Sequence, residues 1–193
     1  MFSFAFCSCN NTQNQPKNPT ENVTVKSHSI NESLNKDYYD VNKKAEEIFN
    51  IINEKNAEKL KALFSADVKN TVSDLDEQIQ ILFDYIDEPI IDYDEGLDGG
   101  GSHTDKGEVL EKDLSTTIVF YTESKDYYLW MTYNLADEND DKVGLDYICF
   151  ADKEEEDRRL NEMIDNPDYE RPEDDGYHQG VICYSSDGSI LKN

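Results

Sequence analysis

The sequence has few of the residues that most catalytic and nucleic-acid-binding sites require. In 193 residues it contains three histidines, one tryptophan and four cysteines, and only 18 lysines and arginines against 43 aspartates and glutamates. The resulting net charge of −25 repels nucleic acid and anionic lipid head groups, which disfavours both as partners. The same charge favours a basic protein partner, although a merely solvated acidic surface is the simpler interpretation.

Long apolar runs are also absent, because no segment reaches the roughly 20 apolar residues that a membrane-spanning helix needs. The first six residues are mostly apolar and lead into Cys7 and Cys9, and residues 10–35 are rich in Asn, Thr, Ser and Lys. Such a polar stretch is typical of a disordered tether. Ser8 followed by Cys9 resembles the end of a bacterial lipoprotein signal peptide, in which the cysteine is lipidated. Cys9 is therefore the candidate lipid-attachment residue.

Two features of this N-terminal stretch depart from the lipoprotein pattern. No Lys or Arg precedes the cysteines, and the apolar region is shorter than the roughly 7–15 residues of a signal peptide. Two localisations therefore stay open. One is an extracytoplasmic membrane lipoprotein whose start is truncated, and the other is a cytoplasmic protein with a frayed N-terminus. In the first case the membrane is reached only through the lipid.

Motifs for metal and cofactor binding are missing as well. The glycines at 99–101 match neither the dinucleotide-binding nor the P-loop pattern. The acidic turn at 137–141 cannot begin an EF-hand, because Lys142 and Ile148 occupy the places of its required Gly and Glu. The three histidines have no second ligand at metal spacing. We expect no metal and no cofactor, and we favour a non-enzymatic function.

What the sequence does contain is a clear helical pattern in its first half. Apolar residues recur at i, i+4, i+7, i+8 and i+11 twice, with a shorter apolar stripe between them. This spacing predicts three helices, over residues 41–52, 56–64 and 73–86. Asn56 is the expected N-cap of the second helix. Ser73 is the expected N-cap of the third, with its side chain bonded to the amide of Asp76.

The second half predicts an antiparallel sheet, because apolar and polar residues alternate there. Strands are expected over residues 90–93, 114–121, 127–135 and 143–151, with a last edge strand over 180–184. The glycines at 96 and 99–101 are expected to form a flexible turn region. Leu145, Tyr147 and Cys149 should share one face of their strand. Helices followed by strands indicate an α+β fold with the helices packed on one face of the sheet.

The chain divides into three parts on this interpretation. Residues 1–36 are a signal remnant and polar tether, residues 37–155 an α+β domain of ordinary size, and residues 156–193 an acidic extension with a short helix and an edge strand. Cys149 and Cys183 lie in two of the expected strands. They would be able to pair outside the cytoplasm, or they are buried free thiols.

Four stretches of the chain resemble a bacterial domain of unknown function found mostly in small extracytoplasmic lipoproteins. They are AEEIFNIINEKNAEKLKALFS (45–65), DLDEQIQILFDYIDEPIIDYDEG (74–96), GGGS (99–102) and VGLDYICFADKEEE (143–156). The resemblance covers residues 39 to about 155. It implies a cone-like fold similar to nuclear transport factor 2, with three helices covering a bent antiparallel sheet. It implies no activity and no catalytic residue.

Such a cone can form a pocket between sheet and helices. The strand aromatics, their neighbouring carboxylates and one histidine are the candidate pocket residues: Asp92, Tyr93, Asp94, His103, Tyr121, Trp130, Tyr133, Asp146 and Tyr147. A carboxyl buried among aromatics would have a raised pKa and would suit acid–base chemistry. The alternative is that the tyrosines fill the core and place their hydroxyls at its wet rim.

Three functions of different classes follow. The first is a surface-tethered, non-catalytic binding module that engages a small ligand or a basic protein. The second is a small cone-fold enzyme that performs acid–base chemistry. The third is an acidic immunity-like protein that neutralises a basic toxin. A homodimer is compatible with each.

Overall fold

The computed structural model describes residues 36–94, 96–166, 179–185 and 188–191. They form a mixed α+β fold with four helices before the sheet and one after most of it. The helices are α1 (Lys36–Asn53), α2 (Ala57–Leu63), α3 (Ala66–Thr71), α4 (Leu75–Tyr85) and α5 (Lys153–Asp165). None of the described helices has the length and apolar character to span a bilayer. Cys9 and the expected tether lie outside the described residues.

The strands form one sheet. They are β1 (Asp92–Tyr93), β2 (Leu97–Gly99), β3 (Ser102–Asp105), β4 (Glu108–Tyr121), β5 (Asp126–Ala136), β6 (Gly144–Asp152) and β7 (Gly180–Cys183). The sheet order is β1-β4-β5-β6-β7, and β2 and β3 also pair with β4. All pairs are antiparallel except β6 with β7, which is parallel.

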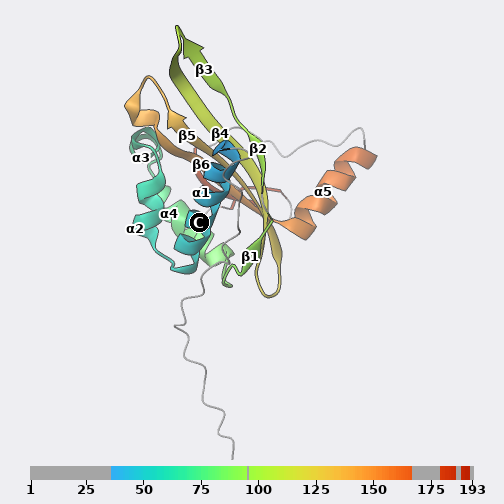
Figure 1. The fold of residues 1–193 in the computed structure, drawn as a ribbon. Helices are drawn as coiled ribbons and strands as arrows, with labels where there is room; N and C mark the ends of the chain where they lie inside the picture. Colours follow the sequence, from blue (N-terminus) through green and yellow to red (C-terminus); the bar gives the residue numbers. More distant parts are fainter. Residues whose placement is uncertain (1–35, 95, 167–178, 186–187, 192–193) are drawn as a thin grey trace, which may run out of the picture.

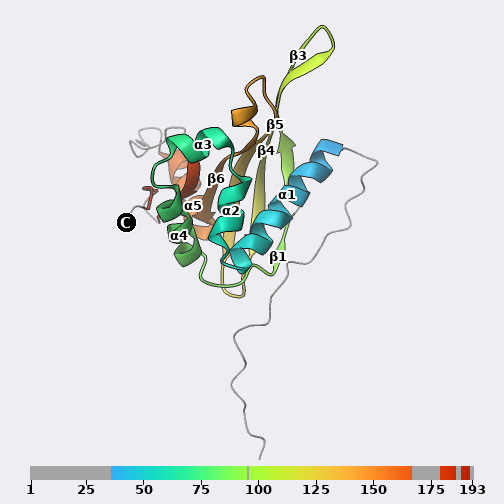
Figure 2. The ribbon, with the colours of Figure 1, turned by 90° about the vertical axis from the view of Figure 1, so that its left-hand side faces the viewer.

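Helices α1 to α4 cover one face of the sheet, and α5 lies on the other side (Figures 1 and 2). The core between α1–α4 and the sheet is filled by aromatic rings. Phe120 of β4 lies 5.0 Å from Phe49 of α1 and 5.2 Å from Tyr127 of β5, measured between ring centroids. Phe150 of β6 meets Phe120 edge-on at 6.0 Å. Because Phe49, Phe120 and Phe150 are fully buried, this part of the interior is packed with side chains.

The helical layer differs from the prediction in two places. Four helices precede the sheet rather than three, because α3 follows α2 after a short break at Ser65. The Ser65 hydroxyl accepts a hydrogen bond from the Val68 amide at 3.2 Å and caps α3. Six residues are too few to show a helical period, so the pattern missed this helix. Ser73 is not the N-cap of α4, since Asp74 holds that position and makes no side-chain capping bond.

The glycine-rich segment is not the simple flexible turn that the sequence predicted. Residues 97–99 pair with Ser115–Thr117 of β4, and the amide of Gly96 donates to Asn42 Oδ1 of α1 at 2.9 Å. A Cβ at Gly96 would lie 2.3 Å from Thr116 Oγ1, so the close approach of this segment to β4 requires glycine. The glycines therefore allow an edge strand to fit between α1 and β4.

A β-bulge changes the expected alternation in β6. Thr132 pairs with Tyr147 and Tyr133 pairs with Leu145, which leaves Asp146 with no residue opposite it. Beyond this extra residue the side chains exchange faces. Leu145 therefore shares the core with Ile148 and Phe150 rather than a face with Tyr147 and Cys149, contrary to the prediction.

The last strand is present as predicted, but its direction is parallel. Helix α5 lies between β6 and β7 in the chain, and a parallel pair requires such a crossover. The register pairs Cys149 with Ile182 and Phe150 with Cys183. Cys183 points into the core beside Phe150, whereas Cys149 points to the opposite face. Both thiols are buried and free, so the pairing hypothesis is wrong.

Lys55, in the turn after α1, closes the C-terminal end of α4. Its ammonium donates to the backbone carbonyls of Phe83 and Ile86, which are among the last carbonyls of that helix. We expect Lys55→Met to lower the free energy of unfolding by about 1–2 kcal/mol, because these acceptors lose a charged donor. Urea unfolding monitored by circular dichroism measures the change.

Lys59→Met is the matched control for this prediction. Lys59 pairs with Glu54 at 2.6 Å on the surface, and we expect its loss to cost less than about 0.5 kcal/mol. Equal losses for the two variants would show that Lys55 does not cap α4.

Candidate functional site

The structure does not gather the predicted pocket residues in one place. Tyr93 is 1% exposed and packs in the core, 5.4 Å from the ring of Phe49. Tyr121 and Asp94 do meet, since the Tyr121 hydroxyl donates to Asp94 Oδ2 at 2.7 Å. This bond raises the pKa of Tyr121 to about 12. Asp92 accepts a hydrogen bond from the backbone amide of Tyr93 at 3.1 Å. The β1 end of the sheet therefore holds the polar pair of Tyr121 and Asp94 at its surface.

The other predicted residues lie on different faces. Tyr133 is half-buried beside the helices, with Lys44 Nζ 5.0 Å from its ring centroid. Trp130 and Tyr147 are half-buried on the opposite face of the sheet. His103 is exposed in β3, opposite Glu111, on the hairpin that extends beyond the rest of the sheet (Figure 1). No arrangement for acid–base chemistry joins these four side chains.

Asp146 is the one predicted carboxyl that is both buried and held in a polar network. It lies in the β6 bulge, is 8% exposed, and accepts a hydrogen bond from Gln179 Nε2 at 3.0 Å. The same nitrogen is 3.3 Å from Asp67 Oδ2, and Thr71 Oγ1 donates to Gln179 Oε1 at 3.2 Å. Burial, with the nearby charge of Asp67, raises the pKa of Asp146. Gln179 and Asp67 were missed because they lie far from the bulge in sequence.

A large open groove lies elsewhere, between α5 and the turn that joins β4 to β5. Its volume is about 1150 Å³. The turn, the end of β6 and one side of α5 supply its lining: Ser124, Lys125, Asp126, Asp152, Lys153, Glu154, Asp157, Arg158, Asn161, Glu162, Asp165 and Asn166. We call this cavity the α5 groove. A smaller cavity of about 430 Å³ lies between α4 and β7, and Asp146 does not line it.

The sequence of α5 explains why this side of the helix is polar. Lys153, Asp157, Asn161 and Asp165 recur every four residues and so lie along one side of the helix. Asp152 caps the helix by accepting a bond from the Glu155 amide at 3.2 Å. Three glutamates fill the first turn, where the helix dipole favours negative charge.

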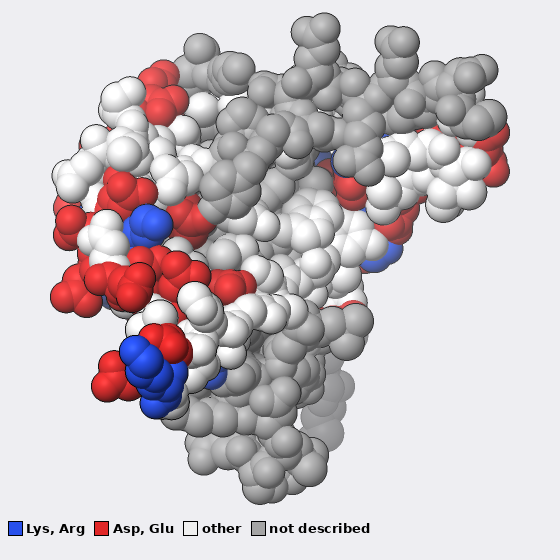
Figure 3. All heavy atoms as spheres, turned by 90° about the horizontal axis from the view of Figure 1, so that it is seen from above, with Lys and Arg blue, Asp and Glu red and all other residues white. Residues whose placement is uncertain are grey.

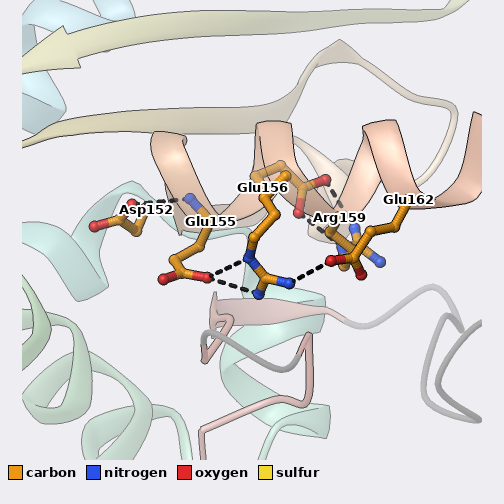
Figure 4. A network of polar contacts seen from close by, with 6 residues as sticks. Asp152, Glu155, Glu156, Arg159 and Glu162 are labelled. Atoms are coloured by element: carbon orange, nitrogen blue, oxygen red, sulfur yellow. Dashed lines mark hydrogen bonds and ion pairs between the residues drawn. The ribbon is translucent and has the colours of Figure 1, made fainter.

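Several ion pairs join residues within α5. Glu156 and Arg159 form a pair at 2.7 Å on the side of α5 that faces the sheet, with exposed side-chain fractions of only 8% and 15% (Figure 4). Arg158 on the outer side bonds Glu155 at 2.8 Å and Glu162 at 2.7 Å. Glu156 is the only buried residue described in this helix. The side of α5 that faces the sheet therefore carries a charged pair rather than an apolar stripe.

The α5 groove carries an excess of negative charge. Its three cations are already paired, Lys125 with Asp152, Lys153 with Asp157, and Arg158 with two glutamates. Three lining carboxylates form no ion pair with any residue that the structure describes: Asp126, Glu154 and Asp165. The wider surface is similar, and Figure 3 shows acidic side chains outnumbering basic ones on the described part of one face. The groove is therefore suited to a cationic ligand.

An aromatic ring lies beside the groove. The Tyr128 hydroxyl donates to Asp157 Oδ1 at 2.8 Å, and Lys153 Nζ lies 5.3 Å from the centroid of the Tyr128 ring. The bond from Lys153 lowers the pKa of Asp157, whereas burial is the main cause that raises the pKa of Tyr128. The sequence predicted a short helix in this charged region. It contained no sign that the helix lies beside Tyr128, because that contact depends on the tertiary fold.

Comparison with known proteins yields one match. The model of a family described as a domain of unknown function, DUF5104, matches residues 47–153, which is more than half of the chain. The matched segment includes α2 to α4 and β1 to β6, and it ends where α5 begins. No curated protein and no solved structure matches the chain significantly.

The raised pKa of Asp146 predicts a pH-dependent stability. Ionising Asp146 costs folding free energy, so its contribution is fully present below the unfolded pKa and is lost as pH rises through the folded pKa. We expect Asp146→Asn to raise Tm at pH 7, by about 2–4 °C for each kcal/mol recovered. The gain should vanish below about pH 3.5, where the carboxyl is neutral in both states.

Thermal melts at the two pH values measure this difference, and Glu58→Gln, an exposed carboxyl of α2, controls for the loss of one charge. A gain of equal size at both pH values would contradict the assignment, since it would not depend on ionisation.

Proposed function

The chain belongs to the family of the domain of unknown function DUF5104, and we propose that it is a non-catalytic binding module whose α5 groove engages a basic segment of another protein. One observation carries this proposal. The groove is large and open, and its cations are all paired internally, while Asp126, Glu154 and Asp165 are left without a cation among the described residues. A lysine- or arginine-rich segment supplies the missing charge.

The arrangement of titratable groups supports binding over catalysis. Acid–base chemistry needs an acid or base within hydrogen-bond reach of a substrate. Asp146 has the raised pKa of such a group, but it is buried in the bulge and already accepts a bond from Gln179. The helix-facing interior is filled by Phe49, Phe120 and other rings. A basic toxin is one partner with the required chemistry, so the immunity-like hypothesis is a special case of this proposal.

The expected strength of the interaction follows from the exposure of the groove. Exposed ion pairs contribute about 0.2–1 kcal/mol each, so three of them account for roughly a three- to 150-fold change in affinity. Charges of this kind act mainly on the association rate and on specificity. We therefore propose a salt-sensitive interface in which additional contacts of the partner supply most of the affinity.

Two further proposals concern the fold and the location of the protein. The cover of four helices on one face of the sheet, and the bulge in β6, support a cone similar to nuclear transport factor 2. The Ser8-Cys9 pair and the polar residues after it support an extracytoplasmic lipoprotein. The binding proposal requires neither of them.

Neutralising the three unpaired carboxylates tests the groove. We expect the combined variant Asp126→Asn, Glu154→Gln, Asp165→Asn to bind a fluorescein-labelled Lys-Ser repeat peptide about tenfold more weakly than the wild type, because it removes three attractive pairs. Fluorescence anisotropy measures the affinity. The wild-type affinity should also fall as salt rises to about 0.15 M, where the Debye length is about 8 Å.

The control variant removes three carboxylates from the opposite, helical side of the protein: Glu47→Gln, Glu58→Gln, Asp84→Asn. It has the same net charge as the groove variant, and we expect it to change the affinity less than about twofold. If both variants weaken binding equally, attraction is general and the groove is not the site.

Metabolic labelling with palmitate tests the tether. In bacterial cells that express the gene with its native upstream region, we expect label on the wild type and on Cys7→Ser but not on Cys9→Ser, because only a cysteine at the processing site is lipidated. Label on Cys9→Ser equal to that of the wild type would exclude Cys9 as the attachment residue.

A further inference from the structure

We propose that the ring of Tyr128 and the carboxylate of Asp157 form a subsite for one lysine or arginine side chain of the partner, and that Lys153 occupies this subsite in the free protein. The inference rests on the proposed function of the α5 groove. It adds the position at which a single cationic side chain is recognised, and it assigns to Lys153 the role of an internal competitor.

The geometry is that of a cation site with an occupant. Lys153 Nζ lies 5.3 Å from the Tyr128 ring centroid, within the roughly 6 Å over which a ring attracts a cation. The same nitrogen pairs with Asp157 Oδ2, and the Tyr128 hydroxyl donates to Asp157 Oδ1 at 2.8 Å. The Tyr128 ring and Asp157 Oδ2 thus contact the ammonium of Lys153, and Asp157 Oδ1 is bound to the Tyr128 hydroxyl.

The aromatic part of the subsite is held in place by the sheet. Tyr128 lies in the middle of the sheet, where its strand pairs with Val119 of β4 and Ala151 of β6. The ring of Trp130, two residues along the same face, lies 5.3 Å from the Tyr128 ring. Lys153, by contrast, has a long side chain that is 31% exposed, so it can leave the ring without any change in the backbone.

The position of Lys153 in its helix is a second, independent observation. It is the first residue of α5, where the helix dipole favours negative charge, and the three residues after it are glutamates. The dipole disfavours a lysine at this position, whereas the glutamates beside it favour one. The contacts of Lys153 with Tyr128 and Asp157 oppose the effect of the dipole and hold a cation at this point of the groove.

These contacts allow a cation of the partner to replace Lys153 in the subsite. The partner's ammonium or guanidinium takes the place of Lys153 against Tyr128 and Asp157, and Lys153 moves into water. Because the subsite is occupied beforehand, the apparent affinity for the partner is reduced by the fraction of molecules in which Lys153 blocks it. Removing the Lys153 charge should therefore strengthen binding of a basic peptide.

The test uses the full chain and the fluorescein-labelled Lys-Ser repeat peptide. We expect Lys153→Met, which keeps an apolar stem of similar length, to bind about three- to tenfold more tightly than the wild type, given the usual strengths of one cation–π contact and one helical ion pair. Tyr128→Leu should bind more weakly by a similar factor. Lys125→Met removes the same charge from the same groove but not from the ring, and we expect less than a twofold gain.

A second readout separates the subsite from simple attraction. Trp130 is the one tryptophan of the chain, and its ring lies against Tyr128. We expect its emission to change when the peptide binds the wild type and to stay constant when the peptide binds Tyr128→Leu. Circular dichroism confirms that each variant is folded.

The outcomes are distinguishable. Equal gains for Lys153→Met and Lys125→Met, or unchanged affinity of Tyr128→Leu, would overturn the subsite and leave the groove proposal standing. Peptide binding that no groove variant alters, or no binding by any form including Lys153→Met, would overturn both.

Discussion

The pairing of β4 on both of its edges is the constraint on which the rest of the structure depends. One edge of this fourteen-residue strand pairs in turn with β1, β2 and β3, and the other pairs with β5. Its helix-facing side chains, Leu114, Ile118 and Phe120, then form the floor on which α1 packs. Because Gly96 admits the edge segment close to Thr116, the position of α1 and the closure of this edge are coupled.

The two faces of the sheet are built on different physical principles. The helix-facing side is an apolar core with dense aromatic contacts. On the other side, the Tyr128 hydroxyl of β5 donates to Asp157 of α5, and the buried pair of Glu156 with Arg159 lies within α5 itself. Leu160 and Ile164 of the same helix are 41% and 79% exposed. A buried ion pair adds little net stability but is costly to break. The groove lies along this polar helix.

The parts of the fold that sequence could predict are those with many repeats of one period. The long apolar stripes predicted α1 and α4, and the alternation of apolar and polar residues predicted β4 and β5. Short or interrupted sequence patterns did not predict the structure correctly. Helix α3 is too short, the extra residue Asp146 shifts the alternation, and the parallel direction of β7 depends on a crossover. The α5 groove lies between a turn and a helix that are about thirty residues apart in the chain, so no local sequence pattern predicted it.

The family match and the folded sheet end at different residues, because β7 lies beyond the matched segment. The family match ends at residue 153, whereas the sheet is completed by residues 180–183, which lie between Gln78 of α4 and the edge of β6. A chain cut at the family boundary would leave the backbone groups of Tyr147–Phe150 without their partner strand and would open an apolar sheet edge to other chains. The unit that the family model matches and the unit with the complete sheet are therefore different lengths of chain, and the segment that connects them supplies the α5 wall of the groove.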